Sequence, residues 1–134
     1  MVETVILCKE GTINSYLSAL VIAMNKKKKG EDVSVIFMQE GLVALIDKKF
    51  RLSPGLEPYS KDIEKNAAMM GVPSDPFELI KEAKSVGVSL YACQAWMKLL
   101  GGKPPRFTVP EGLQKLELSE LIEALDKAKK VFSL

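Results

Sequence analysis

The sequence predicts an α/β protein, a three-layer α/β/α sandwich around a mostly parallel sheet of about five strands. Short runs of β-branched and aliphatic residues alternate along the chain with segments of helical periodicity. Strands separated by helices pair in parallel through right-handed crossovers, which place helices on both faces of one sheet. A length of 134 residues and an apolar fraction of 47% suit a single domain over residues 1–134.

The first half of the chain predicts the order strand, helix, strand, helix. A run of β-branched and aliphatic residues over 2–8 predicts a buried strand. Residues 14–29 predict a helix that is apolar on more than one face and ends in lysines before Gly30. A second buried strand is predicted over 33–38, and a short helix over 42–49.

The second half predicts a long crossover followed by further helices and strands. Residues 48–73 contain three prolines and an apolar cluster at 66–70, which predicts an irregular crossover with a short helix inside. Ser74-Asp75-Pro76 predicts a helix start, because proline is favoured in the first turn. The remaining predictions are a helix over 77–85, a strand over 88–91, a helix over 93–100, a proline-rich loop over 103–112, a helix over 118–128 and a strand over 130–133.

Composition excludes several classes of function. The 19 basic and 17 acidic residues leave a net charge of +2, and only Arg51 and Arg106 are arginines, so we expect no nucleic-acid partner. The chain contains no histidine, which excludes Ser-His-Asp triads, Cys-His dyads and histidine-containing zinc sites. It also lacks the glycine-rich motifs of nucleotide sites. We expect neither a metal site nor a cofactor.

Cysteine content and hydropathy predict the cellular compartment. Two cysteines are too few for a disulfide scaffold, and the chain opens with a predicted strand in place of a secretory leader. The longest apolar stretch, residues 17–24, is far shorter than the roughly 20 residues that span a bilayer. We therefore expect a soluble, cytoplasmic protein without a membrane partner.

Cys93 is the residue at which predicted structure and chemical reactivity coincide. It lies where a strand ends and a helix begins, at the edge of a parallel sheet where α/β proteins bind ligands. The N–H groups of Gln94, Ala95 and Trp96, which follow it, would stabilise a thiolate or a bound anion. The alternative interpretation is a buried cysteine that acts as a small apolar residue.

Further candidates follow the first two predicted strands at the same edge of the sheet. Cys8 ends the first strand and is either a core residue or a second thiol that pairs with Cys93. Glu40 either stabilises the next helix or faces the Cys93 cleft, while Gly41 provides a tight turn. The candidate substrate-binding residues are Gln94, Ala95, Glu40, Gly41 and Lys9.

The segment around Cys93 carries a family resemblance. Residues 90–101 (LYACQAWMKLLG) resemble the DsrE/DsrF-like family of small sulfur-relay proteins, which includes the TusD-type carriers and in which a cysteine also joins a strand to a helix. Residues 35–42 (VIFMQEGL) are similar to the family's aromatic strand and following glycine, and residues 121–133 to its closing helix and strand. The resemblance spans nearly the whole chain, and Tyr-Ala-Cys is its most specific part.

The resemblance implies a function and an assembly. It implies that Cys93 accepts sulfane sulfur, as a persulfide or thiosulfonate, and passes it to a partner protein. It also implies a homo-oligomer, a trimer or hexamer, and the excess of apolar faces on the helix at 14–29, with Met69 and Met70 as neighbours, predicts subunit contacts independently. The alternatives are a thiol redox protein that uses Cys93 with Cys8, and a non-catalytic oligomeric module.

Overall fold

The computed structural model describes residues 3–101 and 108–134. At its centre lies a five-stranded sheet in which every pair of neighbouring strands is parallel. Its strands, in spatial order, are β4 (Gln114–Leu116), β3 (Ser89–Cys93), β2 (Val33–Phe37), β1 (Thr4–Cys8) and β5 (Lys130–Ser133).

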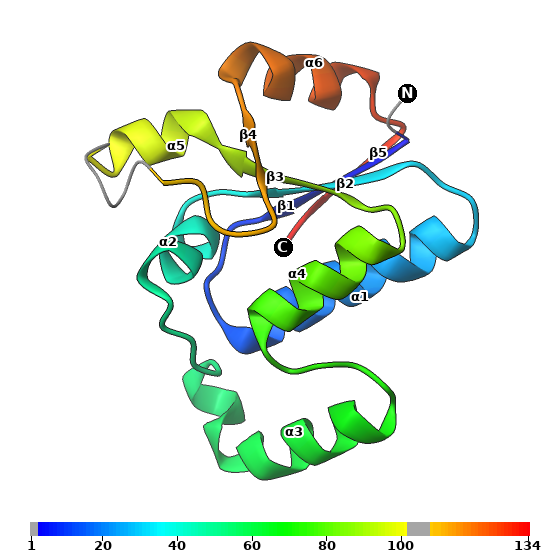
Figure 1. Ribbon diagram of the computed structural model, residues 1–134, viewed down its shortest axis with the longest axis vertical. Coiled ribbons are helices and arrows are strands. Elements are labelled where there is room, and N and C mark those ends of the chain that lie inside the picture. The colour runs from blue at the N-terminus through cyan, green and yellow to red at the C-terminus, as the bar shows by residue number, and fades with distance from the viewer. Residues whose placement is uncertain (1–2, 102–107) are drawn as a thin grey trace.

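Helices cover both faces of this sheet (Figure 1). α1 (Ile13–Lys28) and α4 (Pro76–Ser85) pack on one face, and α6 (Leu118–Lys127) packs on the other. The predicted three-layer α/β/α sandwich is therefore confirmed. The other helical elements are α2 (Glu40–Asp47), the 3₁₀ helix η1 (Pro54–Tyr59), α3 (Ser60–Met69) and α5 (Gln94–Leu99).

Capping residues explain where the two helices of the first face begin. The Thr12 hydroxyl oxygen accepts a hydrogen bond from the N–H of Ser15 at 3.2 Å, at the start of α1. The Asp75 carboxylate accepts one from the N–H of Phe77 at 2.8 Å, and Pro76 fills the first position of α4. Both caps satisfy N–H groups that have no partner inside the helix.

The structure departs from the sequence predictions in the crossover segments. β4 forms where the sequence predicts no strand, because two of its three residues, Gln114 and Lys115, are exposed and only Leu116 is buried. The crossover over 48–73 contains two helical elements, η1 and α3, in place of one short helix at the apolar cluster. Of the proline-rich loop predicted over 103–112, residues 108–112 contain no helix or strand, as predicted, and residues 103–107 lie outside the described residues.

The sheet separates two apolar clusters that define its faces. Cys8, Tyr16 and Phe37 belong to the cluster beneath α1 and α4, and all three are fully buried. Cys93 and Leu121 belong to the cluster beneath α6. Over the ranges 3–101 and 108–134, none of the helices is long and apolar enough to cross a membrane.

Candidate functional site

Cys93 is the last residue of β3 and the residue directly before α5. It is paired in register with Leu116, the last residue of β4. The sequence prediction that this cysteine joins a strand to a helix at the carboxyl edge of the sheet is therefore confirmed. Its φ and ψ of −69° and 113° are those of an extended residue, so the position carries no backbone strain.

The residues just before β4 and the helix after it lie on opposite faces of the sheet. Before β4, Leu113 joins the apolar cluster on the α4 side, and a Cβ on Gly112 would lie 2.7 Å from Ile80. The helix that follows β4, α6, lies on the other face (Figure 1). In open parallel sheets, ligands bind at the carboxyl ends of strands where successive connections diverge in this way. Cys93 occupies that point.

The Cys93 thiol is enclosed, since the residue is only 1% exposed. Its side chain makes no capping hydrogen bond to the first turn of α5, so the expected contact with the N–H groups of Gln94, Ala95 and Trp96 is absent in this conformation. Apolar side chains surround it instead, and the buried members of this cluster are Val5, Ile36, Met38, Leu116 and Leu121. In this conformation the cysteine is a packed apolar residue.

Gln94 and Ala95, two of the predicted substrate-binding residues, are partly buried beside Cys93. The Gln94 side-chain amide is oriented so that both its oxygen and its nitrogen have suitable partners. In this orientation its nitrogen donates to the two carboxylate oxygens of Glu117 at 2.6 and 3.0 Å. Glu117 also caps the start of α6, so this contact joins the first residue of α5 to the residue before α6. Ala95 packs against the apolar cluster around Cys93.

Cys8 does not approach Cys93, so the structure contradicts the alternative in which the two thiols of one chain pair, and agrees with Cys8 as a core residue. β2 lies between their strands, with Cys8 level with Phe37 and Phe37 level with Ala92. Two strand spacings amount to about 10 Å, whereas a disulfide needs Cα atoms within about 7 Å. The two side chains also point to opposite faces of the sheet. Both cysteines are free.

Cys8 has the properties of a structural thiol. It is fully buried, and its Sγ donates a weak hydrogen bond to the backbone oxygen of Glu10 at 3.8 Å. Burial, and secondarily the negative charge of Glu10, raises the pKa of the Cys8 thiol to about 12. The protonated form therefore persists at neutral pH, which favours the core-residue interpretation of Cys8.

The turn between β2 and α2 holds a strained residue that the sequence does not signal. Gln39 has a φ of 53° and a ψ of −134°, a conformation that non-glycine residues rarely adopt. Gly41 is needed for a different reason than the predicted tight turn, because a Cβ there would lie 2.4 Å from the backbone oxygen of Cys8. Its N–H donates to the Lys9 oxygen at 3.0 Å, and its own oxygen accepts from the Tyr16 hydroxyl at 2.5 Å.

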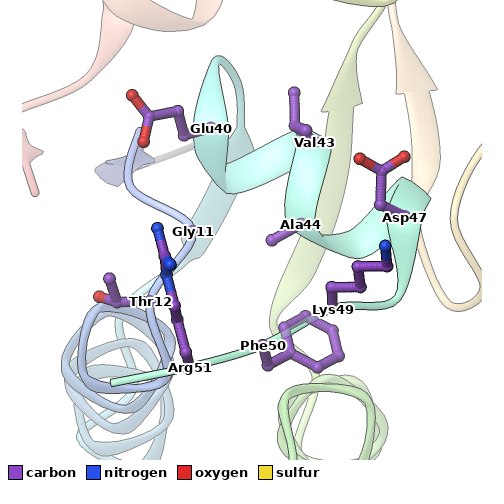
Figure 2. A pocket seen from close by; sticks show the side chains of 9 residues that line it. All are labelled: Gly11, Thr12, Glu40, Val43, Ala44, Asp47, Lys49, Phe50 and Arg51. Atoms are coloured by element: carbon purple, nitrogen blue, oxygen red, sulfur yellow. The ribbon is translucent and has the colours of Figure 1, made fainter. Parts of the chain in front are cut away.

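Glu40 lines a polar pocket of about 420 Å³ at the carboxyl end of β1 (Figure 2). The pocket lies between the loop that contains Gly11 and Thr12, the helix α2, and the segment that follows it, which contributes Lys49, Phe50 and Arg51. Cys93 does not line it, so the structure does not place Glu40 in a cleft with that cysteine. Lys9 contributes to this edge through its main chain, whose N–H donates to the Leu134 oxygen at 3.1 Å.

The whole chain is similar in structure to a solved protein. It aligns with the crystal structure of the ychN protein from E. coli with a TM-score of 0.67, 15% identity and full coverage of both chains. The two proteins share a fold. No protein-family model matches the sequence, and no curated protein matches it.

Proposed function

We propose that this protein is a sulfur carrier in which Cys93 accepts sulfane sulfur and passes it to a partner protein. The observation that carries the proposal is the position of Cys93. It lies at the carboxyl end of β3, beside the point where the connections before and after β4 pass to opposite faces of the sheet. The similarity to the ychN fold supports it, together with the resemblance of residues 90–101 to sulfur-relay proteins.

The transfer requires only one nucleophilic sulfur. The Cys93 thiolate attacks the outer sulfur of a persulfide, R–S–SH, so that a new S–S bond forms, the old one breaks, and R–S⁻ leaves. The products are the Cys93 persulfide and R–S⁻, and the thiol proton has gone to solvent. An acceptor thiolate takes the sulfur from Cys93 by the same exchange. The absence of histidine does not obstruct it, because each step exchanges one thiolate for another.

The enclosed position of Cys93 has a consequence for this mechanism. A thiol that is 1% exposed reacts only when neighbouring side chains move, so access to the donor is gated. The same apolar surroundings exclude water and small reductants from a bound persulfide. We therefore propose that loading is slower than the reaction of a free cysteine and that the loaded form is long-lived.

The geometry separates the carrier from the redox alternative. A reversible disulfide between Cys8 and Cys93 would need β1 or β3 to leave the sheet, since β2 lies between them. Two free thiols suit a reducing compartment, so we propose that the carrier works in the cytoplasm.

Intact-mass spectrometry of the reduced full chain after incubation with sodium polysulfide tests the proposal. The parent and the matched variant Cys8→Ser are expected to gain sulfur mass, and Cys93→Ser is expected to gain none. Undiminished loading of Cys93→Ser would refute the assignment of Cys93. Loss of two hydrogens by the parent, without added sulfur, would favour the redox alternative. A parent that changes in neither way would favour the non-catalytic module.

We further propose that the subunits assemble into a trimer or hexamer through the groove between α1 and α3. Leu17 and Val21 of α1 and Ile63 of α3 line this apolar groove. Large apolar side chains in and around the groove are exposed, namely Ile22, Tyr59, Met69 and Met70. Soluble monomers seldom expose such a patch.

Light scattering coupled to size exclusion tests the assembly. A mass of three or six chains is expected for the parent, against 14.8 kDa for one chain. Met70→Glu should shift the protein toward the monomer, whereas Ile122→Glu, on the exposed side of α6, should not. A parent that stays at the mass of one chain would contradict the proposed assembly.

A further inference from the structure

A second cavity lies between the sheet and α6, on the opposite face from the pocket of Figure 2. Its volume is about 410 Å³, within the range of small-molecule sites. The side chains of Ile36, Leu116, Ala124 and the ring of Tyr91 make its walls largely apolar. Neither cysteine lines it.

Ser34 of β2 and Tyr91 of β3 are the two hydroxyl-bearing residues that line this apolar cavity. Ser34 is 2% exposed, and its Oγ is buried and makes no hydrogen bond within the described residues. The other two buried polar residues of the described chain are satisfied, because Thr4 donates to Glu31 at 3.0 Å and Ser15 donates to Glu10 at 3.1 Å. A buried hydroxyl without a partner is costly, so an unsatisfied one that lines a cavity points to a ligand.

The charged rim of the cavity restricts the charge of that ligand. Lys127 lies 2.6 Å from the Glu123 carboxylate, so its charge is already paired. Glu120 adds a second carboxylate, whose oxygen accepts a hydrogen bond from the N–H of Glu117. Two carboxylates against one ammonium leave the rim with a net negative charge, which disfavours an anion.

We propose that this cavity binds a small, uncharged, phenol-like molecule whose one polar group forms a hydrogen bond with the Ser34 hydroxyl. The apolar walls and the Tyr91 ring accommodate the ring of such a molecule, and Ser34 can donate to or accept from its hydroxyl. The inference goes beyond sulfur transfer and does not depend on whether Cys93 accepts sulfur.

The test uses two probes of nearly equal size, p-cresol, which carries one hydroxyl, and toluene, which carries none. Each is titrated into the full chain, the Ser34→Ala variant and the matched variant Ser18→Ala, while amide NMR shifts are recorded. Ser18 lies in α1 and lines the separate groove between α1 and α3. Saturable shifts at Tyr91 and Ala124 locate binding in the cavity, and shifts at Ile63 locate it in the groove.

We expect p-cresol to bind the parent and Ser18→Ala equally, and Ser34→Ala about two- to tenfold more weakly, the loss for one neutral hydrogen bond. Toluene should bind all three proteins alike. Equal binding of p-cresol to the parent and Ser34→Ala would overturn the proposal, and so would binding confined to the groove, or no saturable shift into the millimolar range. Amide shifts of Tyr91 and Ala124 that depend on protein concentration without any probe would also overturn it. They would show that a second copy of the chain occupies this face.

Discussion

Replacing Cys8 by alanine should make the protein less sensitive to alkaline pH. In the folded protein, burial raises the pKa of this thiol to about 12, whereas an unfolded cysteine titrates near 8.5. Because the folded value is the higher one, the neutral thiol contributes stability that is fully present below about pH 8.5 and is lost as the pH rises toward 12. Between these limits, each pH unit costs the parent about 1.4 kcal/mol.

Between pH 7 and pH 10, ionisation of Cys8 in the unfolded chain is expected to lower the free energy of unfolding by about 2 kcal/mol. This value follows from the ratio of ionised to neutral thiol in the unfolded chain at pH 10. Burial also raises the pKa of the Tyr16 hydroxyl. Because Tyr16 is present in both the parent and Cys8→Ala, its effect on the pH dependence of stability cancels in the comparison. The free energy of unfolding by urea, measured under reducing conditions at both pH values, should therefore fall by about 2 kcal/mol less in Cys8→Ala than in the parent.

The comparison is a difference of differences, so any cavity left by the substitution cancels as long as the variant folds. Cys8→Val, which fills more of the space, serves if Cys8→Ala is too unstable. An equal loss of stability in parent and variant over this pH range would mean that Cys8 ionises freely in the folded protein, and the description of Cys8 as a structural thiol would be wrong.

Three further substitutions test the packing of the edge and the sheet, each by urea unfolding at neutral pH. Gly41→Ala should cost about 1–3 kcal/mol because its methyl group would strike the main chain at the end of β1, while Gly55→Ala, with no atom near its added Cβ, should be close to neutral; equal effects would refute the close approach. Tyr16→Phe should cost about 1–3 kcal/mol by leaving a buried carbonyl without its donor, whereas Tyr59→Phe, at an exposed ring, should cost almost nothing. Ser34→Ala should stabilise the ligand-free protein by about 1 kcal/mol, and a loss of stability would show that its hydroxyl has a partner.

The fold was accessible to sequence analysis because its central elements have strong local signals. The strand ending at Cys8 and the helix with Tyr16 are runs of apolar residues in the expected periods, and Asp75 and Pro76 mark a helix start. β4 could not be predicted from the sequence. Its pairing with β3 depends on tertiary contacts, and a strand with a single buried residue, Leu116, shows no hydrophobic periodicity.

The site was accessible only in part. That Cys93 ends a strand and precedes a helix follows from local sequence, but its separation from Cys8 depends on the strand order and on the register, which no local signal contains. Gln39 adopts a positive φ without being glycine or asparagine, so the strained turn has no signature. Ser34 was also missed, because a serine within an apolar strand pattern does not reveal whether its hydroxyl has a partner.

The two edges of the sheet limit how copies of this chain can associate. β4 and β5 are its outer strands and its shortest, with three and four residues, and each contains a lysine, Lys115 and Lys130. Short, lysine-bearing outer strands are poor templates for the addition of a further strand. A continuous sheet that runs from one molecule into the next is therefore disfavoured at both sides, as is the fibrous growth that such pairing permits. Any assembly must instead form through helix surfaces and side chains, which allows it to close at a fixed number of subunits.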